Sequence, residues 1–201
     1  MRLFIGLAVL AMVVAPASAN LLSDSEGGFE DPWPSSPNAW QGPIERDSSI
    51  HGPGGPAEGS HYGTVQGAHG TNADKYAYLT SIMVPPSEQI TLTGLVAGGT
   101  VNTPNGAELY IQLLDGSNDG SPVMGEWRVT LPNGYGTGWI PFDPIVAHPT
   151  DGHVTIKFGT KILSGWSDGT AIHLDALNLT PEPASLGLFA LAGLPLLRRR
   201  R

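Results

Sequence analysis

The oxygen-bearing side chains between residues 115 and 126 have the spacing of a calcium-binding loop. Positions one, three, five, six and twelve of such a loop are filled by Asp115, Ser117, Asp119, Gly120 and Glu126. Loops of this type lie between helices, whereas both flanks here alternate polar and apolar residues as strands do. Pro122 also stands where these loops place a branched apolar residue. A polar turn between two strands is therefore the favoured interpretation, and the calcium loop is the alternative.

Residues 165–169 read Gly-Trp-Ser-Asp-Gly and match the G-x-S-x-G pattern of a nucleophile elbow. In an elbow a buried strand leads into a helix, and an acid and then a histidine follow in the chain. Here His173 precedes Asp175 on one predicted strand, which reverses that order. We interpret the stretch as a loop. A hydrolase of surface polysaccharides or esters, using Ser167 or a pair of aspartates, is the alternative function.

The remaining titratable groups give catalysis no positive support. No metal-ligand spacing connects the six histidines, which are interpreted as surface polar residues: His51, His61, His69, His148, His153 and His173. No two carboxylates can be placed opposite one another for acid–base chemistry from the sequence. The sequence therefore predicts a protein that is not an enzyme.

Charge is distributed unevenly along the 201-residue chain. Residues 20–181 hold 17 of the 18 acidic and 5 of the 10 basic residues, which gives this body a net charge of about −12. Such a charge repels nucleic acid and anionic lipid headgroups, and it suits neutral ligands or divalent cations. Because the chain has no cysteine, the body must be held by its core without disulfides, and a bound metal ion would add to that stability.

The first 19 residues have the three parts of a secretory signal peptide. Arg2 supplies the positive start, residues 3–14 form an apolar run broken only by Gly6, and Ala17-Ser18-Ala19 is a small-residue cleavage pattern. The run is shorter than the roughly 20 residues of a membrane-spanning helix, although a retained anchor is the alternative. We therefore expect export from the cytoplasm, with cleavage before Asn20.

Residues 181–201 combine three features in a fixed order. Pro181, Glu182 and Pro183 are followed by an apolar run over 186–197 and by four terminal arginines, Arg198, Arg199, Arg200 and Arg201. The apolar run would form a helix of about 18 Å, shorter than the roughly 30 Å hydrocarbon core, and the arginines favour the cytoplasmic side. These features resemble the PEP-CTERM sorting signal of Gram-negative bacteria. The resemblance implies cleavage by an exosortase, transient attachment to the inner membrane and delivery to the cell surface; an ordinary anchor is the alternative.

Between the two ends the dominant hydrophobic period is two. Alternating apolar residues predict strands near 61–67, 76–84, 90–96, 109–113, 127–131, 154–158 and 172–179, and a short opening strand is expected at 20–22. Asn-Gly and Asp-Gly pairs mark the turns between them. We predict an all-β fold, with eight or nine short strands in a two-sheet sandwich.

The last predicted strand changes its buried face. Ile172, Leu174 and Ala176 alternate on one side, whereas Leu177 and Leu179 fall on the other. This pattern predicts a β-bulge near Asp175, which would re-aim the Asp175 carboxylate.

Three parts of the body, residues 20–33, 78–96 and 172–179, carry a family resemblance. They contain Gly28-Phe29-Glu30-Asp31 with Trp33, then Tyr78-Leu79-Thr80-Ser81-Ile82, then Ile172-His173-Leu174-Asp175. Together they resemble carbohydrate-binding modules with a galactose-binding-like jelly-roll β-sandwich. The resemblance implies a structural Ca²⁺ held by the Gly28 carbonyl, Glu30 and Asp175. Alternatively, Glu30 is a solvated loop acid and Asp175 a satisfied residue of the bulge.

Sugar sites in such folds use aromatic rings that stack on the sugar and polar groups that read its hydroxyls. Trp33, Trp139 and Trp166 lie among glycines and prolines and are the candidate ligand-binding residues, or else they plug the ends of the sandwich. Trp127 alternates with Val129 and is expected in the core. We thus expect an exported surface or matrix protein whose body, residues 20–180, binds glycans or is a structural unit among exopolysaccharides.

Overall fold

The computed structural model describes residues 19–30, 40–47, 54–67, 70–71, 74–163 and 165–182. They belong to one compact unit, Ala19–Glu182. The expected signal peptide, Pro183 and the terminal arginines lie outside the described residues. Within the described ranges, no helix is long and apolar enough to cross a membrane.

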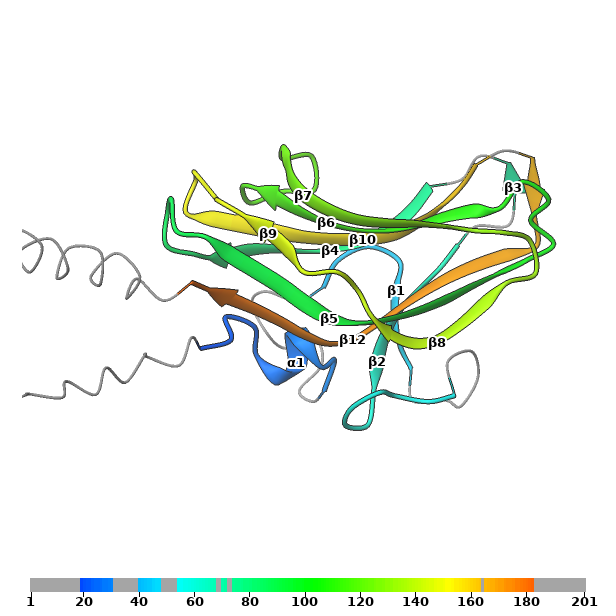
Figure 1. The fold of residues 1–201 in the computed structure, drawn as a ribbon, viewed down its shortest axis with the longest axis horizontal. Helices are drawn as coiled ribbons and strands as arrows, with labels where there is room; N and C mark the ends of the chain where they lie inside the picture. The colour runs from blue at the N-terminus through cyan, green and yellow to red at the C-terminus, as the bar shows by residue number, and fades with distance from the viewer. Residues whose placement is uncertain are drawn as a thin grey trace, which may run out of the picture. The chain divides into compact units, whose positions relative to one another are not determined.

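One of the two large sheets has six strands (Figure 1). Its order is β1-β2-β12-β5-β8, and β9 pairs with β5 beside this path. The bounds are β1 Ile44–Asp47, β2 Tyr62–Gln66, β5 Ile90–Val101, β8 Gly136–Pro141, β9 Ile145–Ala147 and β12 Gly169–Pro181. The last strand of the chain therefore lies in the interior of the sheet, between β2 and β5.

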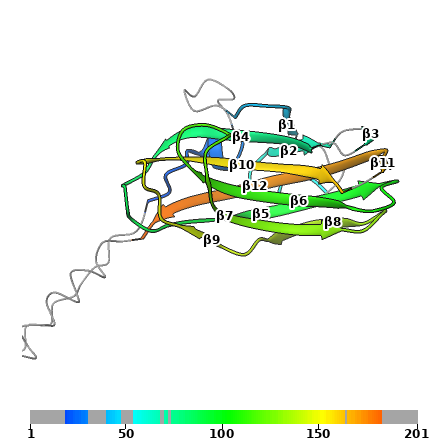
Figure 2. The same cartoon turned by 90° about the horizontal axis from the view of Figure 1, so that it is seen from above.

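The other large sheet has four strands in the order β4-β10-β6-β7. The bounds are β4 Asp74–Met83, β6 Ala107–Asp115, β7 Val123–Leu131 and β10 His153–Ile162. A separate pair, β3 Gly70–Thr71 and β11 Trp166–Ser167, stands at one end of the sandwich (Figure 1). Seen from above, the strands of the two layers run in roughly the same direction, as in aligned sheet packing (Figure 2).

The hydrophobic core lies between the two sheets and follows the predicted period of two. Leu92 and Val96 of β5 are fully buried from one side, and Ile111 of β6 and Phe158 of β10 from the other. The residues between them face outward, so each sheet presents one outer surface. The prediction of an all-β sandwich of two antiparallel sheets is confirmed.

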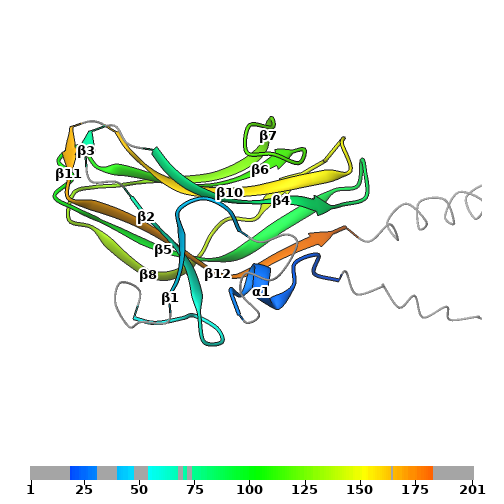
Figure 3. The ribbon, with the colours of Figure 1, turned by 180° about the vertical axis from the view of Figure 1, so that it is seen from behind.

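The N-terminal segment packs against the six-stranded sheet without forming the strand expected at 20–22, so that prediction is wrong. Leu21 N–H bonds to the carbonyl oxygen of Leu179 at 2.8 Å, and the chain then turns into the four-residue helix α1, Asp24–Gly27. A capping box between Ser23 and Glu26 starts this helix. Because these two polar residues satisfy the first amides of the helix, the chain leaves β12 after a single ladder bond. Figure 3 shows α1 beside β12.

Phe29 anchors the residues that follow α1. Its side chain is fully buried and stacks on Trp40 at a centroid distance of 5.5 Å, and Trp40 meets Phe158 edge-on at 5.1 Å. The indole N–H of Trp40 also donates to the carbonyl of Glu26. This aromatic contact holds the segment that carries Gly28 and Glu30.

The predicted bulge in β12 is confirmed. The pairing of β12 with β5 shifts register between Asp175 and Asn178, and Ala176 has a φ of 52°. The extra residue lets Leu174 and Leu177 both face the core. It also turns the Asp175 side chain into a fully buried position beside the loop over residues 54–61.

Candidate functional site

Glu30 and Asp175, two of the three residues predicted to bind calcium, accept hydrogen bonds from the same loop. Asp175 Oδ2 accepts hydrogen bonds from the amides of Ala57 and Glu58 at 2.7 and 2.9 Å. Glu30 Oε1 accepts from the amides of Ser60 and His61 at 2.5 and 3.0 Å. We call residues 54–61 the clamped loop, because carboxylates from two distant segments hold it.

The two clamping carboxyls have opposite pKa shifts. Burial raises the pKa of Asp175, and its bonds from backbone amides offset this only in part. For Glu30, partial burial acts in the same direction, but the bonds from Ser60 and His61 outweigh it and lower the pKa. Glu30 is therefore the stronger anionic anchor of the loop.

The calcium hypothesis can be tested against the donors present. Gly28 and Glu30 line one cavity of about 660 Å³ together with Glu58, as the prediction requires, while Asp175 faces the loop amides. Ca²⁺ needs six to eight oxygen ligands. The described residues hold no group of three or more acidic, histidine or cysteine side chains placed to bind a metal. The donors are hard oxygens of the right kind, but they are engaged with amides, so a bound ion would require the clamped loop to move.

The open side of the four-stranded sheet carries a row of aromatic residues. Register pairs Tyr76 with Gly159, Gly159 with Tyr110, and Tyr110 with Arg128, so these four residues cross β4, β10, β6 and β7 in a line. A Cβ on Gly159 would stand only 2.7 Å from both Tyr110 OH and Tyr76 Cβ. The glycine therefore leaves the space that lets the two tyrosines flank it.

A second row crosses the same strands beside the first. Register pairs Tyr78 with Lys157, Lys157 with Gln112, and Gln112 with Glu126. Tyr78 lies against Tyr76 at a centroid distance of 6.2 Å, and Lys157 Nζ lies 3.7 Å above the centre of the Tyr76 ring. We call the two rows together the open face: Tyr76, Gly159, Tyr110, Arg128, Tyr78, Lys157, Gln112 and Glu126.

Hydrogen bonds fix the polar groups of the open face. Tyr76 OH donates to Asp119 Oδ2 at 2.9 Å, a bond that raises the pKa of Tyr76. Arg128 donates to Glu108 at 2.6 Å and to Glu126 at 3.0 Å. The bond to Glu126 is the main cause that raises the pKa of Arg128. Both cations of the open face are thus matched by acids or rings, and its side chains are held in defined positions.

The open face lies between raised ends. In Figure 1 the loop between β6 and β7 stands at one end of the four-stranded sheet, and the β3–β11 pair stands at the other. The β6–β7 loop contributes directly, because Asp119 binds both Tyr76 and, through its carbonyl, Lys157. The surface between the two ends offers aromatic rings and hydrogen-bonding groups side by side.

Of the three tryptophans predicted to bind ligand, the described residues include the side chain of Trp139. Trp139 donates its indole N–H to Gly55 of the clamped loop at 2.7 Å and packs edge-on against Tyr62. Trp33 and the side chain of Trp166 lie outside the described residues. Trp127 packs against the core near Phe142, as expected.

The two stretches that we interpreted as loops from the sequence, residues 115–126 and 165–169, have structural roles that fit this interpretation. Ser167 Oγ lies 2.7 Å from Thr103 Oγ1 and accepts from the Gly169 amide at 3.1 Å; in the described part of the chain no histidine bonds to it. Asp115 ends β6 and accepts bonds from Thr150, which lower its pKa. The loop after it connects two strands, as predicted.

His173 differs from the expectation of a surface residue. Its ring is partly buried between β12 and Tyr62, and burial lowers its pKa to about 4.

Pro181 ends β12 opposite Ile90, and the amide of Glu182 donates to the carbonyl oxygen of Gln89 at 2.7 Å. No pattern in the sequence marks the clamped loop or the open face, because both depend on contacts between distant segments.

No protein-family model and no curated protein sequence matches the chain. Among solved structures it is similar to the carbohydrate-binding module TmCBM61, solved with β-1,4-galactotriose. The TM-score is 0.51 and the identity 15%, over 82% of this chain and 100% of the module. It is also similar to part of the arabinose-bound MgGH51 α-L-arabinofuranosidase. There the TM-score is 0.52 and the identity 15%, over 84% of this chain but only 27% of the enzyme chain.

At these identities the likeness establishes the fold. The chain is a β-sandwich of the class found in carbohydrate-binding modules. Its similarity to the arabinofuranosidase covers about a quarter of that enzyme chain.

Proposed function

We propose that the described body binds neutral glycans through the open face and catalyses no reaction. The observation that carries the proposal is the pair of cross-strand rows, in which the half-buried rings of Tyr76 and Tyr78 stand beside hydrogen-bonding side chains on an outer sheet surface, while Tyr110 is buried beneath Arg128. Sugars present apolar C–H faces and a rim of hydroxyls, so they are recognised by such a combination of rings and polar groups. The ligand solved with the TmCBM61 module supports this class of partner.

A neutral ligand fits the charges of the open face. Arg128 is already paired with two glutamates, and Lys157 lies on a tyrosine ring. An anionic polysaccharide would have to compete with these internal partners and with the acidic body as a whole. Neutral hydroxyls can instead accept from Gln112 and donate to Glu126 without breaking an ion pair.

Affinity electrophoresis in gels with β-1,4-galactan, xylan or arabinan tests the proposal. We expect at least one neutral polysaccharide to retard the protein, and Tyr78→Ala to weaken the interaction about tenfold, equal to about 1.4 kcal/mol. Met83→Ala is the matched control, because Met83 is 76% exposed on the same strand outside the two rows. Equal retardation of Tyr78→Ala and wild type would refute the open face as the site. No retardation by any polysaccharide would favour a structural role.

The hydrolase alternative lacks a specific supporting observation. Ser167, its candidate nucleophile, is fully buried and bonded to Thr103 rather than to a described histidine. A serine nucleophile needs an adjacent base and an exposed oxygen. We therefore favour binding over hydrolysis.

We further propose that the protein is exported and sorted to the cell surface. The support is sequence alone: the signal-peptide pattern of residues 1–19 and the PEP-CTERM-like order of residues 181–201. The intact mass of protein isolated from its native surface should correspond to a chain that begins at Asn20 and lacks Arg198–Arg201. A mass that retains the arginine cluster would refute processing by an exosortase.

Calcium binding by Gly28, Glu30 and Asp175 remains part of the proposal. A bound ion would join the segment after α1 to β12 and would stabilise the native state, because a ligand bound only by that state raises the melting temperature. We expect a higher melting temperature in calcium than in excess chelator, and a smaller effect in Glu30→Gln. Identical melting curves under the two conditions would refute the ion.

A further inference from the structure

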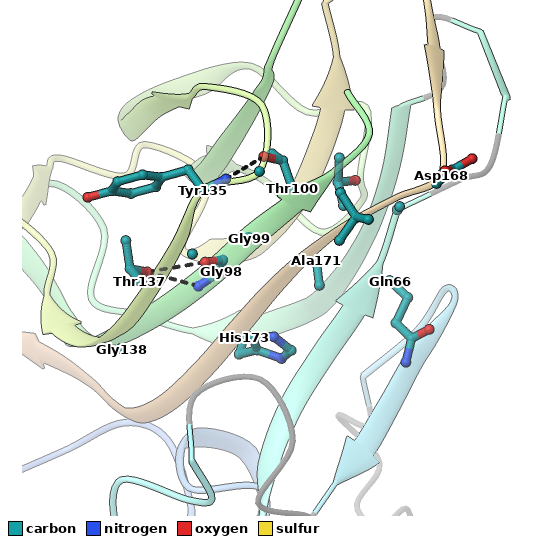
Figure 4. A pocket seen from close by; sticks show the side chains of 16 residues that line it. Gln66, Gly98, Gly99, Thr100, Tyr135, Thr137, Gly138, Asp168, Ala171 and His173 are labelled. Atoms are coloured by element: carbon teal, nitrogen blue, oxygen red, sulfur yellow. Dashed lines mark hydrogen bonds between the residues drawn. The ribbon is translucent and has the colours of Figure 1, made fainter. Parts of the chain in front are cut away.

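The outer surface of the six-stranded sheet carries a groove of about 750 Å³ (Figure 4). It is lined by β2, β12, β5, β8 and the turn before β8. Its residues Ala171 and His173 alternate along β12 with Ile172 and Leu174, which face the core. The groove therefore lies on the side of the sandwich opposite the open face.

A row of small residues produces this groove. Register pairs Gln66 with Ala171, Ala171 with Gly99, and Gly99 with Gly136, so three of the four positions in the row carry at most a methyl group. The row crosses three inter-strand spacings, about 14 Å. Taller side chains stand on both sides of it, with His173 on one side and Tyr135 on the other (Figure 4).

Core packing does not explain all the glycines here. A Cβ on Gly98 would collide with Leu109, so that glycine is required by the interior. A Cβ on Gly138 or Gly169 would meet nothing within 4 Å, and neither residue has a positive φ. Their small size keeps the groove open without serving the fold, which is what space for a ligand requires.

The polar side chains beside the groove are held in place. The ring of His173 packs edge-on against Tyr62 at a centroid distance of 5.5 Å, and its Nδ1 atom is buried without a hydrogen bond among the described residues. Thr137 Oγ1 is bonded to both the amide and the carbonyl of Gly98, at 3.0 and 3.4 Å. These contacts give the groove walls of defined shape beside the row of small residues.

The charges of the groove define the ligand class. None of the described residues that line it is a lysine or arginine, and its one acid, Asp168, is exposed and bonded to Asn102. Phosphate, sulfate or uronate groups would find no counter-charge there. Tyr135 is 47% exposed and offers a ring at the groove.

We propose that this groove is a second binding site for a neutral saccharide, which lies over the row of small residues between His173 and Tyr135. The choice of a saccharide rests on the proposed glycan-binding function, whereas the site itself rests on the groove. With the open face on the opposite sheet, one molecule holds two polysaccharide strands, so the protein cross-links a matrix rather than only adhering to it.

Amide chemical shifts on titration with β-1,4-galactotriose, galactose or xylose, up to about 10 mM, test the two sites separately in one experiment. This range detects millimolar dissociation constants. We expect shifts at residues 98–101, 134–138 and 169–173. Ala171→Leu fills the groove and should abolish these shifts while leaving those of the open face unchanged.

Tyr78→Ala is the matched control, since it should remove only the shifts of the open face. An absence of shifts in the groove with all three sugars would overturn the second site even if the open face responds. Shifts in the groove alone would instead refute the proposed function of the open face. Groove shifts that are unchanged in Ala171→Leu would also overturn the assignment.

Discussion

The contact between Gly63 and Phe29 allows a quantitative test of how the N-terminal segment is anchored. Gly63 lies in β2, and a Cβ placed there would stand 2.6 Å from Phe29 Cδ1 and closer still to two other ring atoms. Cβ atoms essentially never approach other atoms within 3.0 Å. Because Phe29 is fully buried and stacked on Trp40, its ring cannot move without disturbing the core. Gly63→Ala therefore overpacks the interior.

The expected cost of Gly63→Ala follows from two opposing effects. Overpacking of a core costs about 1–3 kcal/mol, and replacing glycine by alanine recovers about 0.4–1 kcal/mol through the unfolded chain. We expect a net loss of about 1–2 kcal/mol in the free energy of unfolding. Urea denaturation followed by tryptophan fluorescence measures it, and the slope with denaturant should stay unchanged.

Gly138→Ala is the matched control for Gly63→Ala. Gly138 is also a strand glycine without positive φ, but a Cβ there meets nothing within 4 Å. This variant should match wild type or gain up to about 1 kcal/mol. If the two variants have equal stability, Phe29 does not fill the space beside β2, and its role as the anchor of the Glu30 segment is wrong.

Three further substitutions give distinct outcomes. Asp175→Asn removes an acceptor of the clamped loop, so amide hydrogen exchange over 54–61 should accelerate while the core strands stay protected. The bonds from Thr150 give Asp115 a lower pKa in the folded than in the unfolded state, so the ionised carboxylate stabilises the folded state. This contribution to the free energy of unfolding is fully present above the unfolded pKa and is lost as pH falls through the folded pKa. Asp115→Asn should therefore flatten the loss of stability below about pH 4, measured as the urea midpoint. Gly159→Ala should lower stability by about 1–3 kcal/mol and weaken glycan retardation, because its Cβ would collide first with the backbone carbonyl of Lys75 in β4 and then with the flanking tyrosines.

Much of the fold follows from local sequence. Alternating apolar residues such as Val154, Ile156 and Phe158 predict a half-buried strand, and the structure places it at the centre of the four-stranded sheet. The β12 bulge was also predictable, because the buried side changes between Ala176 and Leu177 and only an inserted residue reconciles the two patterns. Both predictions need only the order of side chains along one strand.

The candidate sites depend on information that one strand does not hold. Tyr76 and Tyr110 become neighbours through Gly159, and only the register of three strands makes this row. Outward residues of a strand look like ordinary solvent-facing residues until their cross-strand partners are known. Asp175 and Glu30 were predicted to share a calcium ion, which stays a prediction, and the partners of their carboxylates in the structure are amides of a loop whose course the sequence does not reveal.

The position of β12 dictates the order in which the chain becomes a folded protein. The β1–β2 hairpin and the strands that pair with β5 belong to one sheet only because β12 hydrogen-bonds to β2 on one side and to β5 on the other. A chain that is synthesised from its N-terminus therefore contains two separate parts of this sheet until residues 169–181 are available to pair with both. Because the pairs that β12 makes are non-local, we expect their formation to be the slow step in completing the six-stranded sheet.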